Sequence, residues 1–175
     1  MGGKIVVAAD GSESGNRAVD LAAELSAKLE RDLCIVHVML YGRPTAEFKH
    51  FAETEGLVES VADSASVRGG SRSASLHGLF ASAADEVHTA KLTIALGEHV
   101  AATAKTRAED AGGRNVTART CVGDCADEIL DVAEAEKAEM IVMGRRGLGR
   151  VREALLGSVS QKVLHHAPCA VVIVH

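Results

Sequence analysis

Residues 4–40, KIVVAADGSESGNRAVDLAAELSAKLERDLCIVHVML, decide the predicted fold. The segment opens with the apolar, β-branched run Lys4–Ala9, which is typical of a buried strand. Asp10–Ser12 breaks that run, and Ser14–Glu30 then carries apolar residues at helical spacing. Leu33–Leu40 is a second apolar run of strand length. A strand, a helix and another strand in this order predict two parallel strands joined by a right-handed crossover.

The same alternation returns in the C-terminal half of the chain. The predicted helices there are 90–111, which Gly112 and Gly113 end, 126–137 and 158–165, and the predicted strands are 116–122, 140–143 and 170–174. The sequence therefore predicts an α/β fold with a doubly wound, five-stranded parallel sheet and helices on both faces, which is a Rossmann-like architecture.

The composition limits the classes of partner. A length of 175 residues suits a single domain, 1–175, and the net charge of −5 gives no reason to expect nucleic acid as a partner. No run approaches the ~18 apolar residues of a membrane span, and the N-terminus has no leader pattern, so we expect no membrane insertion and a cytoplasmic location. The four cysteines are then expected to be free thiols.

The stretch at about 42–89 fits the alternation less well, and we interpret it as a flexible insertion. A helix over Thr45–Ala62 is compatible with the pattern. Ser64–Ser75, rich in Ser and Gly, predicts a mobile loop. That loop is either a lid over a ligand or an insertion without a role in binding.

The segment Met143–Ser160, MGRRGLGRVREALLGSVS, leads from a predicted strand into a predicted helix. Gly144 and Gly147 can form a tight turn whose N–H groups point at an anion. The helix opened by Ser158 offers free N–H groups and a dipole that favour a phosphate, and the hydroxyls of Ser158 and Ser160 can add donors. The alternative is a loop that uses glycine only for turns, with Ser158 as an ordinary N-cap.

The expected sheet brings a second loop to this segment. Ligands of doubly wound sheets bind at the carboxyl ends of strands, where the strand order reverses. Asp10 follows the first strand and Gly144 the fourth, so the two loops face one crevice if those strands are neighbours. Asp10 can then accept hydrogen bonds from ribose hydroxyls. Its other possible role, which is compatible with the first, is to cap the next helix together with Ser12 or Ser14.

The glycine pattern Gly144-x-x-Gly147-(nine residues)-Gly157-Ser158 resembles the ATP-binding signature of the universal stress protein family. The opening and closing segments resemble that family too, and the likeness covers about 3–41 and 90–175. The resemblance implies the fold of the adenine-nucleotide α-hydrolases. It also implies a regulatory stress-response module that binds ATP, hydrolyses it slowly at most, forms homodimers through the strand 170–174 and acts on an unknown protein partner.

The resemblance also implies which residues bind the nucleotide, ATP with or without Mg²⁺. Asp10 would bind the ribose and the backbone of Val38 the adenine, and the phosphate loop and helix would hold the phosphates. The full set is Ala9, Asp10, Val38, Met143, Gly144, Arg146, Gly147, Gly157, Ser158, Val159 and Ser160.

This sequence departs from the family pattern at two places. Ala8 stands where many members have Pro, and Gly123-Asp124-Cys125 stands where Gly-x-Pro is frequent. Asp124 brings a negative charge near the expected pocket, which weakens the case for a triphosphate, and Arg145 and Arg146 can offset it.

Three alternatives stay open. The first two are a stress protein that binds no nucleotide and acts only through partners, and one whose ligand is AMP or cAMP. The third is an ATP α-hydrolase, but those enzymes use Ser-Gly-Gly-x-Asp-Ser after strand one, and residues 8–12 lack the paired glycines. We identify no catalytic residue. Cys121, Cys125, His165, His166 and Cys169 are interpreted as ordinary thiols and helix-end histidines rather than a metal site, and His37 as a satisfied core histidine.

Overall fold

The computed structural model describes residues 3–39, 86–148 and 156–175. The chain divides into two compact units, one formed by 1–41 with 97–175 and the other by 42–96. The sheet belongs to the first unit, and residues 86–96 of the helix over 86–110 belong to the second. The predicted insertion at 42–89 lies outside the described residues except for 86–89, and so do the helix expected over 45–62 and the loop expected over 64–75.

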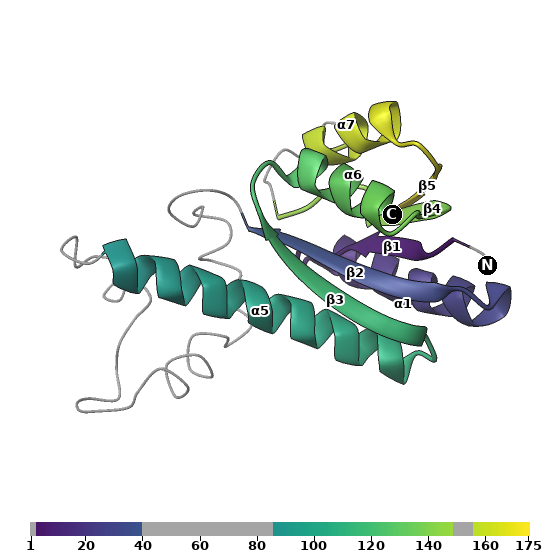
Figure 1. The fold of residues 1–175 in the computed structure, drawn as a ribbon, viewed down its shortest axis with the longest axis horizontal. Coiled ribbons are helices and arrows are strands. Elements are labelled where there is room, and N and C mark those ends of the chain that lie inside the picture. The colour runs from purple at the N-terminus through teal and green to yellow at the C-terminus, as the bar shows by residue number, and fades with distance from the viewer. Residues whose placement is uncertain (1–2, 40–85, 149–155) are drawn as a thin grey trace. The chain divides into compact units, whose positions relative to one another are not determined.

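Five parallel strands form one sheet, as predicted (Figure 1). They are β1 (Ile5–Ala8), β2 (Asp32–Met39), β3 (Arg114–Val122), β4 (Met140–Gly144) and β5 (Ala170–Val174). The strand order is β3-β2-β1-β4-β5, so the chain winds outward from β1 first in one direction and then in the other. The expected proximity of the first and fourth strands is confirmed, because Ile5 pairs with Met140 and Ala8 with Met143.

Four helices belong to the described residues, and the predicted ones agree with them to within a few residues. They are α1 (Glu13–Leu29), α5 (Glu86–Asp110), α6 (Cys125–Ala135) and α7 (Ser158–His166). Figure 1 shows α1 on one side of the sheet and α6 with α7 on the other. The predicted end of α5 is confirmed, since Gly112 has a φ of 86°, a conformation that glycine adopts without strain.

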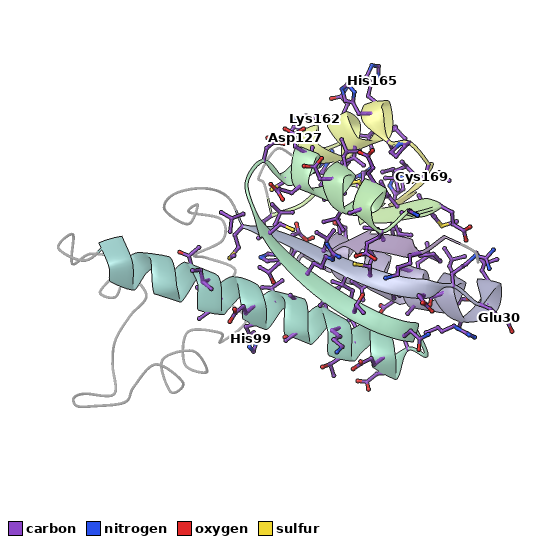
Figure 2. The ribbon with its side chains drawn as sticks, in the orientation of Figure 1. Glu30, His99, Asp127, Lys162, His165 and Cys169 are labelled. Atoms are coloured by element: carbon purple, nitrogen blue, oxygen red, sulfur yellow. The ribbon has the colours of Figure 1, made fainter. Side chains whose placement is uncertain are left out.

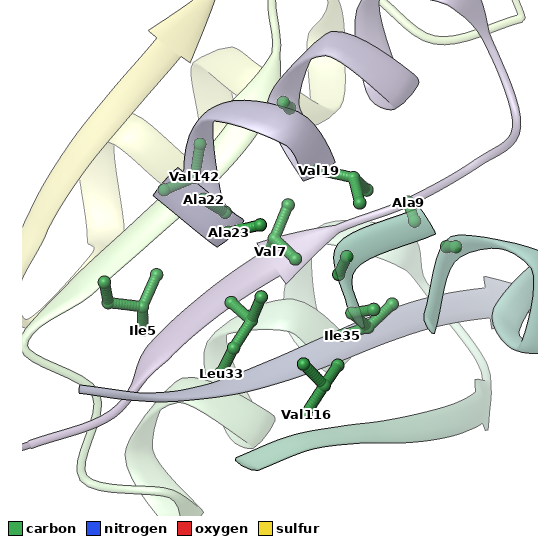
Figure 3. Close-up of a cluster of buried hydrophobic side chains, with 13 residues drawn as sticks. Ile5, Val7, Ala9, Val19, Ala22, Ala23, Leu33, Ile35, Val116 and Val142 are labelled. Carbon is green, nitrogen blue, oxygen red and sulfur yellow. The ribbon is translucent and has the colours of Figure 1, made fainter. Parts of the chain in front are cut away.

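Alternation along the central strands divides the core between the two faces of the sheet. Val7 and Ile35 belong to the cluster under α1, which Figure 3 shows, whereas Val6 and Val36 belong to the cluster under α6 and α7. All four side chains are buried because helices cover both faces. The apolar runs that marked these strands in the sequence therefore follow from burial on both sides.

Candidate functional site

A pocket opens at the carboxyl ends of β1 and β4, where the loops after these strands meet. Its volume is about 110 Å³. Residues of β1, β2, β4 and the helices α1, α6 and α7 line it, namely Ala8, Ala9, Asp10, Gly15, Val36, Val38, Cys125, Ile129, Met143, Gly144, Arg146, Gly147, Val159 and Ser160. The crevice that the sequence predicted between the two loops is therefore present.

Nine of the eleven predicted binding residues line this pocket, and Gly157 and Ser158 do not. The prediction missed the apolar wall that Val36 and Ile129 form. Val36 precedes Val38 by two residues on β2, so the alternation of strand side chains places both on the same face. That signal was available in the sequence.

The Asp10 carboxylate is fixed by the start of α1. Its Oδ1 accepts hydrogen bonds from the N–H of Ser12 at 3.0 Å and from the Ser12 hydroxyl at 2.6 Å. The Ser12 oxygen in turn accepts from the N–H of Gly15 at 3.1 Å and is the N-cap of α1. Asp10 thus supports the cap without being the cap, and Oδ2 is not used in these bonds.

Glycines lie against both oxygens of this carboxylate. A β-carbon at Gly15 would overlap Oδ1 of Asp10, and a β-carbon at Gly147 would lie 2.5 Å from Oδ2. The φ of Gly147 lies outside the positive range, so a left-handed backbone conformation is not what requires glycine here. What requires glycine at 147 is the close approach of Asp10.

The loop after β4 is held by hydroxyls from two helices. Ser14 of α1 donates to the carbonyl oxygen of Arg146 at 2.5 Å. The hydroxyl of Ser160, on α7, lies 3.0 Å from the carbonyl oxygen of Gly144 and 3.1 Å from that of Arg145. Because a hydroxyl has a single hydrogen and these carbonyls occupy it, the Ser160 side chain supports the loop and does not offer a donor to the pocket.

The first turn of α7 presents backbone donors. The helix begins at Ser158, and its N-cap Gly157 makes no side-chain cap bond. The first intrahelical donor at this end is the N–H of Gln161, which bonds the Gly157 carbonyl oxygen at 2.9 Å. The N–H groups of Ser158, Val159 and Ser160 therefore have no acceptor within the helix, and the helix dipole adds to their attraction for an anion. Ser158 is the first helical residue and not the N-cap.

The charge of Asp124 is engaged away from the pocket. Its Oδ1 caps α6 by accepting from the N–H groups of Ala126 and Asp127, at 3.1 and 3.2 Å. Lys162 of α7 lies 3.1 Å from the same oxygen and 2.7 Å from Asp127 (Figure 2). The Asp127 N–H and then Lys162 hold the pKa of Asp124 below its ordinary value. Asp124 does not line the pocket, and Lys162, which it shares with Asp127, offsets part of the charge that we counted against a triphosphate.

The cysteines and histidines carry no reactive arrangement in the described part of the chain. All four cysteines are free, as predicted, and burial raises the pKa of Cys125 at the pocket wall, which keeps this thiol neutral. No group of three metal-ligating side chains gathers among residues 3–39, 86–148 and 156–175. His37 is only partly satisfied, because its Nε2 has no hydrogen-bond partner among the described residues.

A comparison with models of known protein families identifies the family of this chain. The sequence model of the Universal stress protein family matches residues 1–175. The chain belongs to the universal stress protein family. Universal stress protein YxiE of Bacillus subtilis is 31% identical over 176 residues, which cover 99% of each chain. Universal stress protein Rv1636 of Mycobacterium tuberculosis is 43% identical over 72 residues, 41% of this chain and 49% of that protein, so this match spans about half of the relative's length.

Solved structures of the family share the fold. A universal stress protein from Archaeoglobus fulgidus has a TM-score of 0.64 at 20% identity, with all of both chains covered. A universal stress protein in complex with cAMP has a TM-score of 0.60 at 23% identity, covering 100% of this chain and 98% of that one. The Archaeoglobus fulgidus protein in complex with dAMP has a TM-score of 0.60 at 20% identity, with 100% and 99% covered. Within the described residues, the helices are too short or too polar to cross a bilayer.

Proposed function

We propose that this universal stress protein is a regulatory module that binds ATP in the pocket between β1 and β4. One observation carries the proposal: Asp10, Gly147 and the first turn of α7 meet around a pocket that also has an apolar wall. A nucleotide needs these three surfaces together, since its base is flat and largely apolar, its sugar donates hydrogen bonds and its phosphates are anions.

The proposed orientation follows from the chemistry of each wall. Val36, Val38 and Ile129 form an apolar surface that suits the adenine ring. Oδ2 of Asp10, which the α1 cap leaves unused, accepts from the ribose hydroxyls. The phosphates lie along the loop after β4 and reach the free N–H groups at the start of α7, with the Arg146 side chain at the pocket wall.

Adenine nucleotides in two structural relatives support the ligand class. One of these relatives was solved with cAMP and the other with dAMP. We favour ATP here because Gly157 and Ser158 of the glycine pattern lie at the α7 N-terminus, whose N–H groups suit additional phosphates. Whether Mg²⁺ accompanies the nucleotide is part of the test below.

Regulatory binding suits the pocket better than rapid catalysis. Oδ1 of Asp10 is committed to Ser12, the Cys125 thiol is kept neutral by burial, and His37 does not line the pocket. No acid and base face each other among the lining residues, so the described walls of the pocket provide no pair for general acid–base catalysis of hydrolysis. We therefore propose slow hydrolysis at most.

We also propose that the protein forms a homodimer through β5. This strand is at one edge of the sheet, next to β4 only. The N–H of Arg145 donates to the carbonyl oxygen of Val174 at 2.7 Å, so the backbone groups of Val174 face β4. Because the direction alternates along a strand, the N–H and C=O groups of Val171 and Ile173 face outward and can pair with a second copy. The cytoplasmic location and the protein partner stay predictions.

Binding is tested on the purified protein in two steps. The protein is denatured and any released nucleotide is identified by chromatography and mass spectrometry. The nucleotide-free protein is then titrated calorimetrically with ATP, AMP and cAMP, with and without Mg²⁺. We expect the tightest binding for ATP. Tighter binding of AMP or cAMP would show that this nucleotide, and not ATP, is the ligand. Absence of both released nucleotide and binding heat would refute the proposal.

The variant Asp10→Asn sharpens this test. Asparagine keeps a carbonyl oxygen for Ser12, so the α1 cap survives, but its amide nitrogen at the position of Oδ2 cannot accept from a ribose hydroxyl. Loss of one charge-assisted hydrogen bond should weaken ATP binding roughly ten- to hundredfold. Inorganic triphosphate, which lacks the ribose, should bind this variant as it binds the wild type.

A further inference from the structure

His37 lies near the carboxyl end of β2 on the face opposite the pocket. Alternation along β2 places it on the same face as Leu33 and Ile35, where its ring lies next to Gly97 of α5, whereas Val36 and Val38 face the pocket. Its side chain is only 4% exposed. Burial lowers the pKa of His37, so the ring is neutral near pH 7.

The ring holds one backbone carbonyl. Nδ1 of His37 lies 2.8 Å from the carbonyl oxygen of Ala9. A carbonyl oxygen can only accept, so Nδ1 carries the proton and donates it. In the neutral ring Nε2 then has a lone pair, and it finds no partner among the residues that the structure describes.

This carbonyl belongs to the peptide that leads into Asp10. The pairing of β1 with β2 ends at Ala8 and Val36, and the N–H of Ala9 still donates to the Val36 carbonyl oxygen at 2.9 Å. The carbonyl group of Ala9 lies beyond the last pair of β1 with β2. The His37 ring provides the hydrogen bond that a strand partner would otherwise provide to this carbonyl. Because the Ala9 carbonyl and the Asp10 N–H share one planar peptide, fixing that carbonyl fixes the direction in which Asp10 leaves the strand.

We propose that His37 is a positioning residue of the nucleotide site: its Nδ1–H holds the Ala9 carbonyl so that the Asp10 carboxylate faces the pocket. The proposal rests on the proposed function. A purely structural role is served better by an apolar side chain, because it costs free energy to bury an imidazole whose Nε2 has no hydrogen-bond partner among the described residues. We infer that the hydrogen bond from Nδ1 to the Ala9 carbonyl is the reason for a histidine at position 37.

Two amide variants separate the nitrogens of the ring. In His37→Asn the amide nitrogen takes the place of Nδ1 and can still donate to Ala9, whereas in His37→Gln it takes the place of Nε2 and cannot. We expect His37→Gln to weaken ATP binding roughly three- to tenfold and His37→Asn to bind like the wild type. Inorganic triphosphate should bind the His37→Gln and His37→Asn variants equally well, because His37 acts through Asp10, which binds the ribose.

Nuclear magnetic resonance tests the same point, and its first measurement uses the wild type and needs no variant to fold. The imidazole spectrum should show the proton of His37 on Nδ1. In the variants, the amide resonance of Asp10 should shift in His37→Gln and stay near its wild-type position in His37→Asn. A proton on Nε2 in the wild type, or equal shifts in the two variants, would overturn the proposal.

The outcomes distinguish this proposal from the function it rests on. If the wild type binds ATP and Asp10→Asn weakens binding but His37→Gln does not, the role of His37 falls and the proposed function stands. If His37→Gln weakens binding further in an Asp10→Asn background, His37 acts by another route and the proposal also falls. If the wild type binds no nucleotide, both proposals fall.

Discussion

A β-carbon at position 147 would lie 2.5 Å from Oδ2 of Asp10, so Gly147 and Asp10 can coexist in this arrangement only because residue 147 has no side chain. The contact joins the loop after β1 to the loop after β4, at the edge of the sheet where the pocket opens. The identity of residue 147 therefore controls the position of the Asp10 carboxylate.

Replacing Gly147 by Val should displace Asp10 and weaken ATP binding at least about tenfold, which corresponds to loss of one charge-assisted hydrogen bond. The sheet should remain intact, because the substitution changes a loop and no core strand. Titration calorimetry measures the affinity, and circular dichroism checks the fold. A folded Gly147→Val protein with wild-type affinity would show that this glycine has no part in the site.

A double-mutant comparison identifies the cause of that effect. Asp10→Gly removes the carboxylate that a β-carbon at 147 would meet. Gly147→Ala should therefore lower the melting temperature of the wild type more than that of the Asp10→Gly protein. Equal changes in the two backgrounds would mean that another neighbour restricts position 147.

Two serines in the first turn of α7 should behave differently. Ser160 is 3% exposed and its hydroxyl bonds the carbonyl oxygens of Gly144 and Arg145, whereas Ser158 is exposed. Ser160→Ala removes the hydroxyl that donates to the buried Gly144 carbonyl, whereas the Arg145 carbonyl still accepts from the Gly157 N–H, and it should lower the free energy of unfolding by about 1–3 kcal/mol. Ser158→Ala should change it by less than about 0.5 kcal/mol. Urea denaturation measures both, and similar losses would contradict the assigned role of Ser160.

The dimer proposal is tested at Val171, whose backbone N–H faces away from β4. Val171→Pro removes this outward donor and places a ring where a partner strand would pair, so it should shift the protein from dimer to monomer. Val171→Ala is the matched control, since it loses similar side-chain packing but keeps the N–H. Light scattering should find a dimer for the wild type and the control. A dimeric proline variant would place the interface elsewhere.

Stability should fall in mildly acidic solution because of His37. Burial lowers its folded-state pKa below the ordinary 6.5, while the hydrogen bond to the Ala9 carbonyl and, after it, the charge of Asp10 oppose part of this shift. As the pH falls below about 6.5, the unfolded chain binds a proton that the folded chain refuses, so the free energy of unfolding decreases. The contribution reaches at most about 1.4 kcal/mol per pH unit.

Urea denaturation between about pH 7.5 and about 5.5 measures this dependence. His37→Asn is the control, because asparagine does not titrate in this range and keeps a donor for Ala9. The difference in stability between the wild type and the variant should change with pH in that window. A constant difference would mean that burial does not suppress the charged form of His37.

Regular structure was predictable because its signals are periodic. The runs that became β1 and β2 are apolar throughout, as strands covered on both faces must be, and α1 shows helical spacing between them. Their order along the chain then implied a parallel sheet. The placement of Asp10 near Gly144 followed from the general position of ligand sites in such sheets.

Contacts between distant loops left no such signal. The sequence pointed to Gly147 as part of a tight turn facing an anion, and nothing local shows that Asp10 approaches it. It also counted the Ser160 hydroxyl as a phosphate donor, although two carbonyls of the β4 loop engage it. His37 looked like an ordinary core residue, because its bond to Ala9 exists only after β1 and β2 have paired. These features depend on tertiary geometry, which periodicity does not encode.

The strand order has a consequence for synthesis of the protein on the ribosome. β1 is the central strand, and β2 can cover one of its edges soon after both have emerged. The other edge waits for β4, because Ile5 pairs with Met140, and until then the growing chain carries an apolar strand with open hydrogen-bonding groups. The pocket is also lined from two distant parts of the chain: β1, β2 and the start of α1 come from the N-terminal part, and β4, α6 and α7 come from the C-terminal part. A nucleotide therefore cannot assist the folding of the first half and can stabilise only a chain that is nearly finished, so a chaperone that covers the open edge of β1 would act before any ligand does.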